Sequence, residues 1–113
     1  MATLREYCGR NILEIEGGRI REYCGRYLYE INGNIVREYC GRNLFEINGN
    51  CIRRYCGPNV LEVNGSIIRE YCGRNVAEWD GSRIREYCGK YLYEVNGFLS
   101  HSEKMALIAI LFG

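Results

Sequence analysis

The chain lacks the residue groups that usually build a catalytic or metal centre. Its 113 residues include one histidine, one proline and one tryptophan, and its cysteines form no CxxC pair. Without such groups there is no Ser/His/Asp or Cys/His arrangement and no zinc-ligand spacing. A net charge of +1 gives no general attraction to nucleic acid or to an anionic membrane. The longest apolar run, 105–112, is too short to cross a bilayer.

What is present indicates one small folded domain, 1–113. Apolar residues make up 47% of the chain, with ten tyrosines and a single proline, which excludes a disordered composition. The first residues, MATLREY, contain no apolar segment of the kind found in secretory signals. The cysteine count of seven is odd, which favours free thiols in a reducing compartment. We therefore expect a cytoplasmic protein.

Six copies of a 16-residue unit fill positions 5–100 without an insertion. They are REYCGRNILEIEGGRI, REYCGRYLYEINGNIV, REYCGRNLFEINGNCI, RRYCGPNVLEVNGSII, REYCGRNVAEWDGSRI and REYCGKYLYEVNGFLS. A glycine falls at every eighth residue from Gly9 to Gly97, so the chain turns every eight residues.

The turn dipeptides alternate between two kinds. Asn-Gly or Asp-Gly closes five of the units, as at Asn48-Gly49, and favours type I′ hairpin turns. Cys-Gly occupies the other end of each hairpin. The six-residue segments between turns, such as 34–39 and 42–47, are rich in β-branched and aromatic residues. The sequence therefore predicts twelve antiparallel strands in one meander over 2–95.

The last segment has a different pattern. Ser100 and Glu103 form a capping box, which predicts a helix over 100–112. From Met105 to Phe112 no polar residue interrupts the run, so we expect the helix to be buried on every side.

Two-residue turns at both ends would fix the pairing of the strands. Tyr39 would then oppose Arg42, Val36 would oppose Phe45, and Ile47 would oppose Asn50. One sheet face becomes the core, and it carries Leu4, Leu13, Ile15, Ile20, Tyr29, Ile31, Val36, Phe45, Ile47, Ile52, Leu61, Val63, Ile68, Ala77, Trp79, Ile84, Tyr93 and Val95.

The opposite face would carry Arg37, Tyr39, Arg42, Leu44 and Glu46 with their counterparts. Arginine and glutamate then form a ladder around the outside, with Glu46 diagonal to two arginines. A bulged turn at either end would move these side chains to the opposite face of the sheet.

Closure of the meander removes two unpaired edges. A twelve-stranded barrel has a radius of about 10 Å, too wide for side chains alone to fill, and an α-helix of about 10 Å diameter fits the bore. The predicted fold is mainly β: a closed antiparallel twelve-stranded barrel of six hairpin repeats, with the apolar C-terminal helix inside it.

This layout resembles the tubby-like superfamily, which includes tubby C-terminal domains, plant LURP-one-related proteins and phospholipid scramblases. The resemblance covers the whole chain and rests on strand count, meander order and the terminal SEKMALIAILF. The chain matches no motif of those families, and its turns are shorter than the loops of the larger relatives. The tubby branch binds phosphoinositide head groups, so the resemblance implies a module for anionic lipid surfaces. The hairpin repeats are also similar to small bacterial β-flower proteins. Fold analogy carries little weight for function.

The six cysteines in turns, Cys8, Cys24, Cys40, Cys56, Cys72 and Cys88, are expected to form a ring at one rim. Equivalent turns lie two strands apart, about 10 Å, too far for a disulfide or a shared zinc ion. We expect no metal and no cofactor, and read each cysteine as a small turn residue copied by duplication.

Tyrosine and basic residues flank these turns and form the candidate binding surface. One interpretation is that these side chains stack on a ligand. The interpretation we favour is that they form rows of cation–π contacts that stiffen the hairpins. The candidate residues are Tyr23, Arg26, Tyr39, Arg42, Tyr71 and Arg74. Pro58 replaces the arginine of the fourth unit, so the ring is interrupted there.

No position suggests catalysis. A glutamate at the same place in every unit, from Glu14 to Glu94, is a ladder member, and His101 falls at a helix start. We expect a non-enzyme, with three functions open: a binding or scaffolding module for a protein or small ligand, a membrane-surface module for anionic lipid head groups, or a structural, self-assembling protein. No specific nucleic acid partner is predicted, and a monomer is expected.

Overall fold

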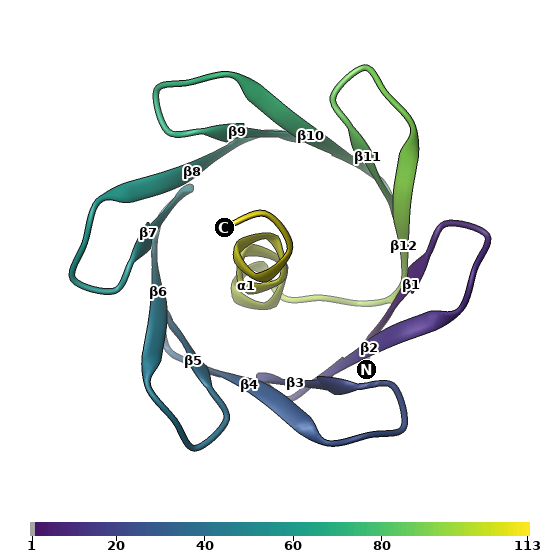
Figure 1. The fold of residues 1–113 in the computed structure, drawn as a ribbon, viewed down its shortest axis with the longest axis vertical. Coiled ribbons are helices and arrows are strands. Elements are labelled where there is room, and N and C mark those ends of the chain that lie inside the picture. The colour runs from purple at the N-terminus through teal and green to yellow at the C-terminus, as the bar shows by residue number, and fades with distance from the viewer. Residues whose placement is uncertain (1) are drawn as a thin grey trace.

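The computed structural model describes residues 2–113 and contains the predicted twelve strands and one helix (Figure 1). Each strand pairs antiparallel with its neighbours in sequence, and β1 pairs with β12 to close the barrel. The elements are β1 (Ala2–Glu6), β2 (Asn11–Glu16), β3 (Arg19–Glu22), β4 (Tyr27–Asn32), β5 (Ile35–Glu38), β6 (Asn43–Asn48), β7 (Cys51–Arg54), β8 (Asn59–Asn64), β9 (Ile67–Glu70), β10 (Asn75–Asp80), β11 (Arg83–Glu86), β12 (Tyr91–Gly97) and α1 (His101–Phe112).

The barrel is a short ring, and the molecule is a disc of 37 × 34 × 17 Å. Helix α1 runs along the axis, and six hairpin ends project outward from the ring (Figure 1). We call these projections petals: each consists of one Cys-Gly turn and the strand ends beside it, and the turns join β1 to β2, β3 to β4 and so on to β12. The cysteine turns therefore splay apart around the circumference instead of lining the mouth of the bore as expected.

The register agrees with the prediction in the middle of each hairpin and differs at both turns. Val36 lies opposite Phe45, as predicted, but beyond it Arg37 pairs with Asn43, so Tyr39 does not lie opposite Arg42. At the Asn-Gly turn the prediction was wrong by one residue on each strand: Ile47 pairs with Ile52 and not with Asn50. Gly49 is the first central residue of this turn, with φ +65°, which matches a type II′ turn and not type I′. Because each strand moves by one residue, this turn leaves the side chains beside it on their predicted faces.

A β-bulge near each petal places one row of side chains on the core side of the sheet, where the prediction had them outside. Between Val36 and Arg37 the register with β6 shifts by one residue, and the other five hairpins shift at the same place. An extra residue re-aims its neighbours. The counterparts of Leu44, predicted outside, consequently pack against the core in four units: Ile12, Leu28, Val60 and Val76.

The core consists of a ring of strand side chains around the helix. Its innermost members are fully buried, one from each odd-numbered strand as predicted: Leu4, Ile20, Val36, Ile52, Ile68 and Ile84. Met105, Leu107 and Ile108 of α1 are also buried, which contributes up to about 5–9 kcal/mol of transfer free energy. Residues 110–112 are only half-buried, so the helix is not enclosed along its whole length.

Polar contacts hold the start of the helix in place. Ser100 and Glu103 make the predicted capping box. The other carboxylate oxygen of Glu103 accepts a hydrogen bond from the backbone N–H of Gly18, 3.2 Å away in the β2–β3 turn. The ammonium of Lys104 lies 5.1 Å from the centre of the Trp79 ring, a cation–π contact. The helix is thus tied to both halves of the barrel.

The Arg and Glu ladder is present on the outer wall. Each unit contributes one ion pair across a hairpin, directly opposite and not diagonal as predicted, as between Arg53 and Glu46. The last pair, Arg5 with Glu94 at 3.3 Å, joins the first strand to the last. The hydrogen bond and charge of Glu78 raise the pKa of the Arg85 guanidinium above its ordinary value. Most of these pairs are partly exposed, so solvent screens their attraction, whereas the carboxylate of Glu14 is buried.

Within residues 2–113, α1 is the sole helix, and it is too short to span a membrane.

Removal of the helix should unfold the barrel. A chain ending at Ser102 would leave a bore of about 10 Å radius that cannot stay open. Leu107→Asp buries an unpaired carboxylate and should destabilise by at least about 4 kcal/mol. Phe98→Ser is the matched control, because Phe98 is 82% exposed. Circular dichroism melting should show loss of cooperative folding in the first two variants only. A truncated chain that melts cooperatively as a monomer would contradict the role of the helix.

Candidate functional site

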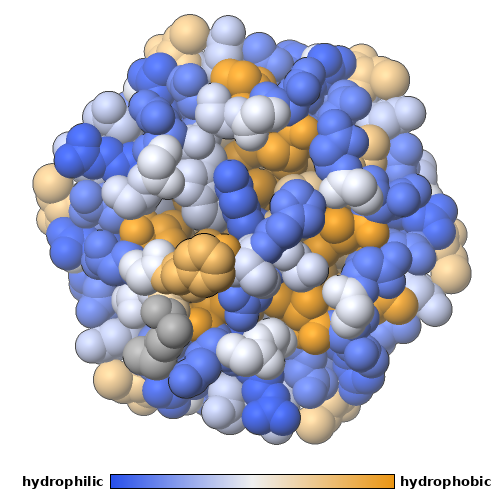
Figure 2. All heavy atoms as spheres, turned by 180° about the vertical axis from the view of Figure 1, so that it is seen from behind, coloured by the Kyte–Doolittle hydropathy of each residue, from blue (hydrophilic) through white to orange (hydrophobic). Residues whose placement is uncertain are grey.

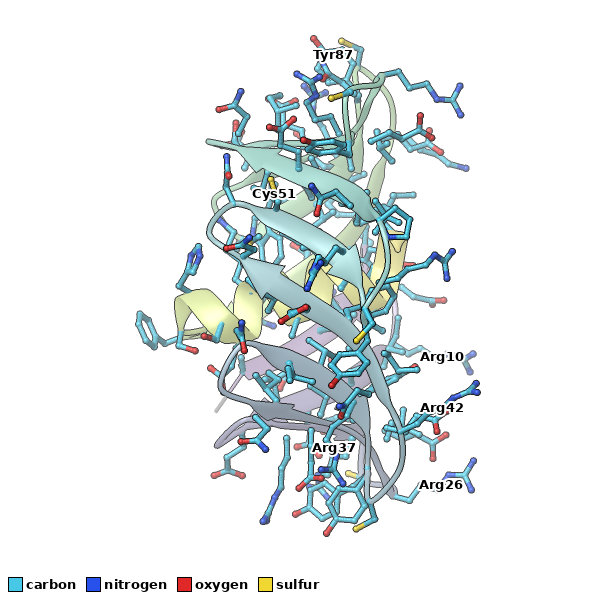
Figure 3. The ribbon with its side chains drawn as sticks, turned by 90° about the vertical axis from the view of Figure 1, so that its left-hand side faces the viewer. Arg10, Arg26, Arg37, Arg42, Cys51 and Tyr87 are labelled. Carbon is cyan, nitrogen blue, oxygen red and sulfur yellow. The ribbon has the colours of Figure 1, made fainter. Side chains whose placement is uncertain are left out.

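Several petal arginines lie on one face of the disc. Arg10, Arg26 and Arg42 extend from the side on which α1 ends (Figure 3). We call this side the petal face. All six candidate residues, Tyr23, Arg26, Tyr39, Arg42, Tyr71 and Arg74, are exposed on three petals. The structure thus spreads them along the circumference and does not gather them into one pocket.

The petal turn has a tight backbone. In the third unit the Gly41 N–H donates to the Glu38 carbonyl and the Glu38 N–H donates to the Arg42 carbonyl, both at 2.9 Å. A Cβ on Gly41 would lie 2.9 Å from Cβ of Glu38, so only glycine fits. Cys40, the third residue of this turn, has φ +54°, a value that type II turns require and that favours glycine or asparagine.

All six turn cysteines share this backbone conformation. Their φ angles lie between +54° and +56°, and within residues 2–113 they are the only non-glycine residues with positive φ. The left-handed region costs an L-residue with a Cβ roughly 1–2 kcal/mol. All six thiols are free and exposed. No cluster of three or more His, Cys, Asp or Glu side chains suited to a metal ion occurs in the described part of the chain.

The basic residues of the petals have acidic neighbours. Arg42 lies 3.8 Å from Glu38, and Arg74 lies 3.9 Å from Glu70. The same Glu and Arg or Lys positions occur on three more petals. The fourth petal differs, because Arg54 replaces the glutamate and Pro58 the arginine. The petal face therefore carries both signs of charge, with one locally basic petal.

The expected tyrosine–arginine pairs are replaced by different partners. Tyr39 stacks on Tyr27, with ring centres 5.1 Å apart, and Arg19 lies 5.8 Å from the Tyr27 ring. An equivalent cluster of Tyr7, Tyr91 and Arg83 closes the barrel beside β1 and β12. In residues 2–113 no cation–π contact involves Arg26, Arg42 or Arg74.

Sequence reasoning missed these two clusters, although a signal was present. Arginine at positions 19 and 83 accompanies tyrosine at 27 and 91, whereas the other four units have asparagine at the equivalent of 27 and no arginine at the equivalent of 19. A comparison of the repeats would have paired the two positions.

Grooves separate the petals. One of about 540 Å³ lies between the first two petals, with Ile12, Leu13 and Leu28 among its lining residues and Glu6, Arg10, Glu22 and Tyr23 around them. Another of about 410 Å³ reaches the helix end: it is lined by Val60, Val76 and Phe112 together with Arg54, Glu70, Arg74 and Glu86. Each groove has apolar side chains bordered by charges of both signs. The bulge described above supplies the apolar row.

The opposite face, where α1 begins, also carries apolar groups. Apolar patches show between polar side chains there (Figure 2). A small pocket of about 200 Å³, lined by Trp79, Leu99 and Lys104, lies where the helix begins. His101 is exposed at the helix start, and Glu14 and its counterparts are engaged in the ion-pair ladder. These groups form no catalytic arrangement among the described residues.

No family model, curated protein or solved structure matches this chain. The resemblance to the tubby-like superfamily accordingly stays a prediction from layout.

Replacement of a petal cysteine by glycine should stabilise the protein. Cys40→Gly removes the steric cost of the left-handed conformation, and the larger backbone entropy that glycine loses on folding offsets part of this gain. We therefore expect the free energy of unfolding to rise by about 0.5–1 kcal/mol. Cys40→Ala keeps the strain and serves as the control, with little change. Gly41→Ala should lower stability by about 1–3 kcal/mol because its Cβ meets Glu38. Urea denaturation measures all three. A destabilised Cys40→Gly would contradict this account of the turn.

Proposed function

We propose that the chain is a non-catalytic binding module whose petal face takes an extended segment of a partner protein. The observation that supports this most is the set of grooves between petals, with apolar side chains at the base and both signs of charge around them.

The groove chemistry matches a polypeptide. The apolar base, such as Ile12 and Leu28, would take one or two apolar side chains of the partner. Glu6, Glu22 and Arg10 around it would pair with basic and acidic side chains of the same segment. A nucleic acid or an anionic lipid would meet the carboxylates as well as the arginine.

A rigid frame favours such a site. The closed ring, the central helix and the six ion pairs fix the petals before a partner arrives. A preformed surface loses little conformational entropy on binding.

We place the lipid alternative second. The arginines of the third and fifth petals lie within 4 Å of glutamates, which lowers their attraction for anionic head groups. Arg54, whose petal lacks the glutamate, is the residue that would favour lipid. Self-assembly through an open edge is disfavoured because β1 and β12 are paired over five residues.

Peptide display tests the proposal. Random 12-residue peptides would be panned against the folded protein, and the enriched sequences labelled for fluorescence anisotropy. We expect peptides that contain an apolar residue flanked by both charges. Leu28→Asp should weaken binding by about tenfold or more, and the triple variant Arg10→Ala, Arg54→Ala, Arg74→Ala, which removes the arginines that line the grooves, by a further severalfold, because groove and border both contribute.

Thermal melting of both variants is the stability control. The arginines are exposed, so the triple variant should melt within a few degrees of the original chain. Failure to enrich any peptide whose binding depends on the grooves would overturn the proposal. Co-flotation with vesicles that contain phosphoinositide at low salt, lost in the triple variant, would establish the lipid alternative instead.

A further inference from the structure

We infer that the petal cysteines join copies of this chain edge to edge, through disulfides between petal tips of neighbouring molecules. The occupant of each tip is a second copy of the same disc. This inference is independent of the proposed partner segment, because it uses the circumference and not the grooves.

The first support is the choice of residue at positive φ. Where the chain needs a positive φ at the Asn-Gly ends of its hairpins, it uses glycine, as at Gly33, Gly49 and Gly65. At the six petal tips it uses cysteine every time. Glycine would satisfy the backbone in both places, so the turn itself does not explain the thiol.

The second support comes from comparison of the six repeats. Six positions carry the same residue in every unit, represented by Arg5, Tyr7, Cys8, Gly9, Glu14 and Gly17. The arginine and glutamate form the ladder, and both glycines are required by turns. Tyrosine stacking accounts for two units, those of Tyr7 and Tyr39. Among these positions, the cysteine has no structural role at any unit.

The third support is placement. The tips project outward in the plane of the disc, so two discs can meet tip to tip without contact between their faces (Figure 1). All six thiols are exposed and unpaired within residues 2–113. Because six tips surround one disc, each copy can contact several other copies. Binding of a single partner would not require six tips.

Charge complementarity favours a second copy as the partner. On either side of Cys40 lie Glu38 and Arg42, which are 3.8 Å apart within the petal. When two such tips meet about a two-fold axis, the glutamate of one faces the arginine of the other, so the two ion pairs can be shared between the copies. Four other petals carry the same charges. The fourth petal carries Arg54 and Pro58 beside Cys56, so two copies of it would bring like charges together.

A reducing compartment keeps the tips as free thiols, and under oxidising conditions the linkage forms by thiol–disulfide exchange with a low-molecular-weight disulfide such as oxidised glutathione. A tip thiolate attacks the glutathione disulfide, which gives a mixed disulfide and releases one glutathione thiolate. The tip thiolate of a second molecule then attacks the mixed disulfide and releases the second glutathione. Overall, two cysteine thiols are oxidised and one glutathione disulfide is reduced to two thiols.

Two single-tip variants provide a matched test. In each, five petal cysteines are changed to Gly and Cys51 to Ser; one keeps Cys40 and the other keeps Cys56. Both would be incubated with oxidised glutathione, and dimers quantified by non-reducing electrophoresis. We expect the Cys40 chain to dimerise about fivefold to tenfold faster than the Cys56 chain at low salt, and the difference to vanish at high salt.

Each outcome decides the inference. Glutathione adducts without dimers in both variants would overturn it, and so would equal rates at low salt. If a variant does not fold, the original chain is oxidised briefly and its cross-links mapped by mass spectrometry. Links between copies that under-represent Cys56 support the inference, whereas disulfides within one chain overturn it.

Discussion

The whole structure depends on the match between a ring of twelve strands and one helix. A barrel of this strand number has a bore of about 10 Å radius, which strand side chains alone leave unfilled. Six fully buried residues, one from each odd-numbered strand, surround Met105, Leu107 and Ile108 of α1. The ring supplies no core without the helix, and the helix has no polar face to expose without the ring.

The two ends of each hairpin serve different purposes. At the end opposite the petal glycine supplies the positive φ, and the turn at Gly17 and Gly18 holds the helix start through a hydrogen bond from Gly18 to Glu103. At the other end a bulge turns apolar side chains such as Leu28 onto the core, and the petals splay outward. The bulge thus creates the grooves on which the proposed function rests, and the splay presents the cysteines at the circumference.

Regular features were predictable from the sequence and local departures were not. Repeat length fixed strand number, Ser100 and Glu103 fixed the helix start, and Val36 was correctly paired with Phe45. The sequence leaves the bulge beside Arg37 open as an alternative to two-residue turns, because the Cys-Gly dipeptide alone does not decide the length of the turn. Tyr39 was paired with Arg42 on the assumption of a two-residue turn, whereas its stacking partner Tyr27 belongs to the adjoining unit. Of the six candidate residues, the exposure was predicted but not the separation onto different petals.

Hydrogen exchange by NMR tests the central claim most directly. The amides of Met105, Leu107 and Ile108 would be compared with those of core strand residues such as Ile20 and Ile52. If helix and ring form one cooperative unit, both groups exchange only through global unfolding, with the same free energy and the same denaturant dependence. Rapid exchange of the helix amides while the strand amides stay protected would show that the ring stands without its helix, and would contradict the account.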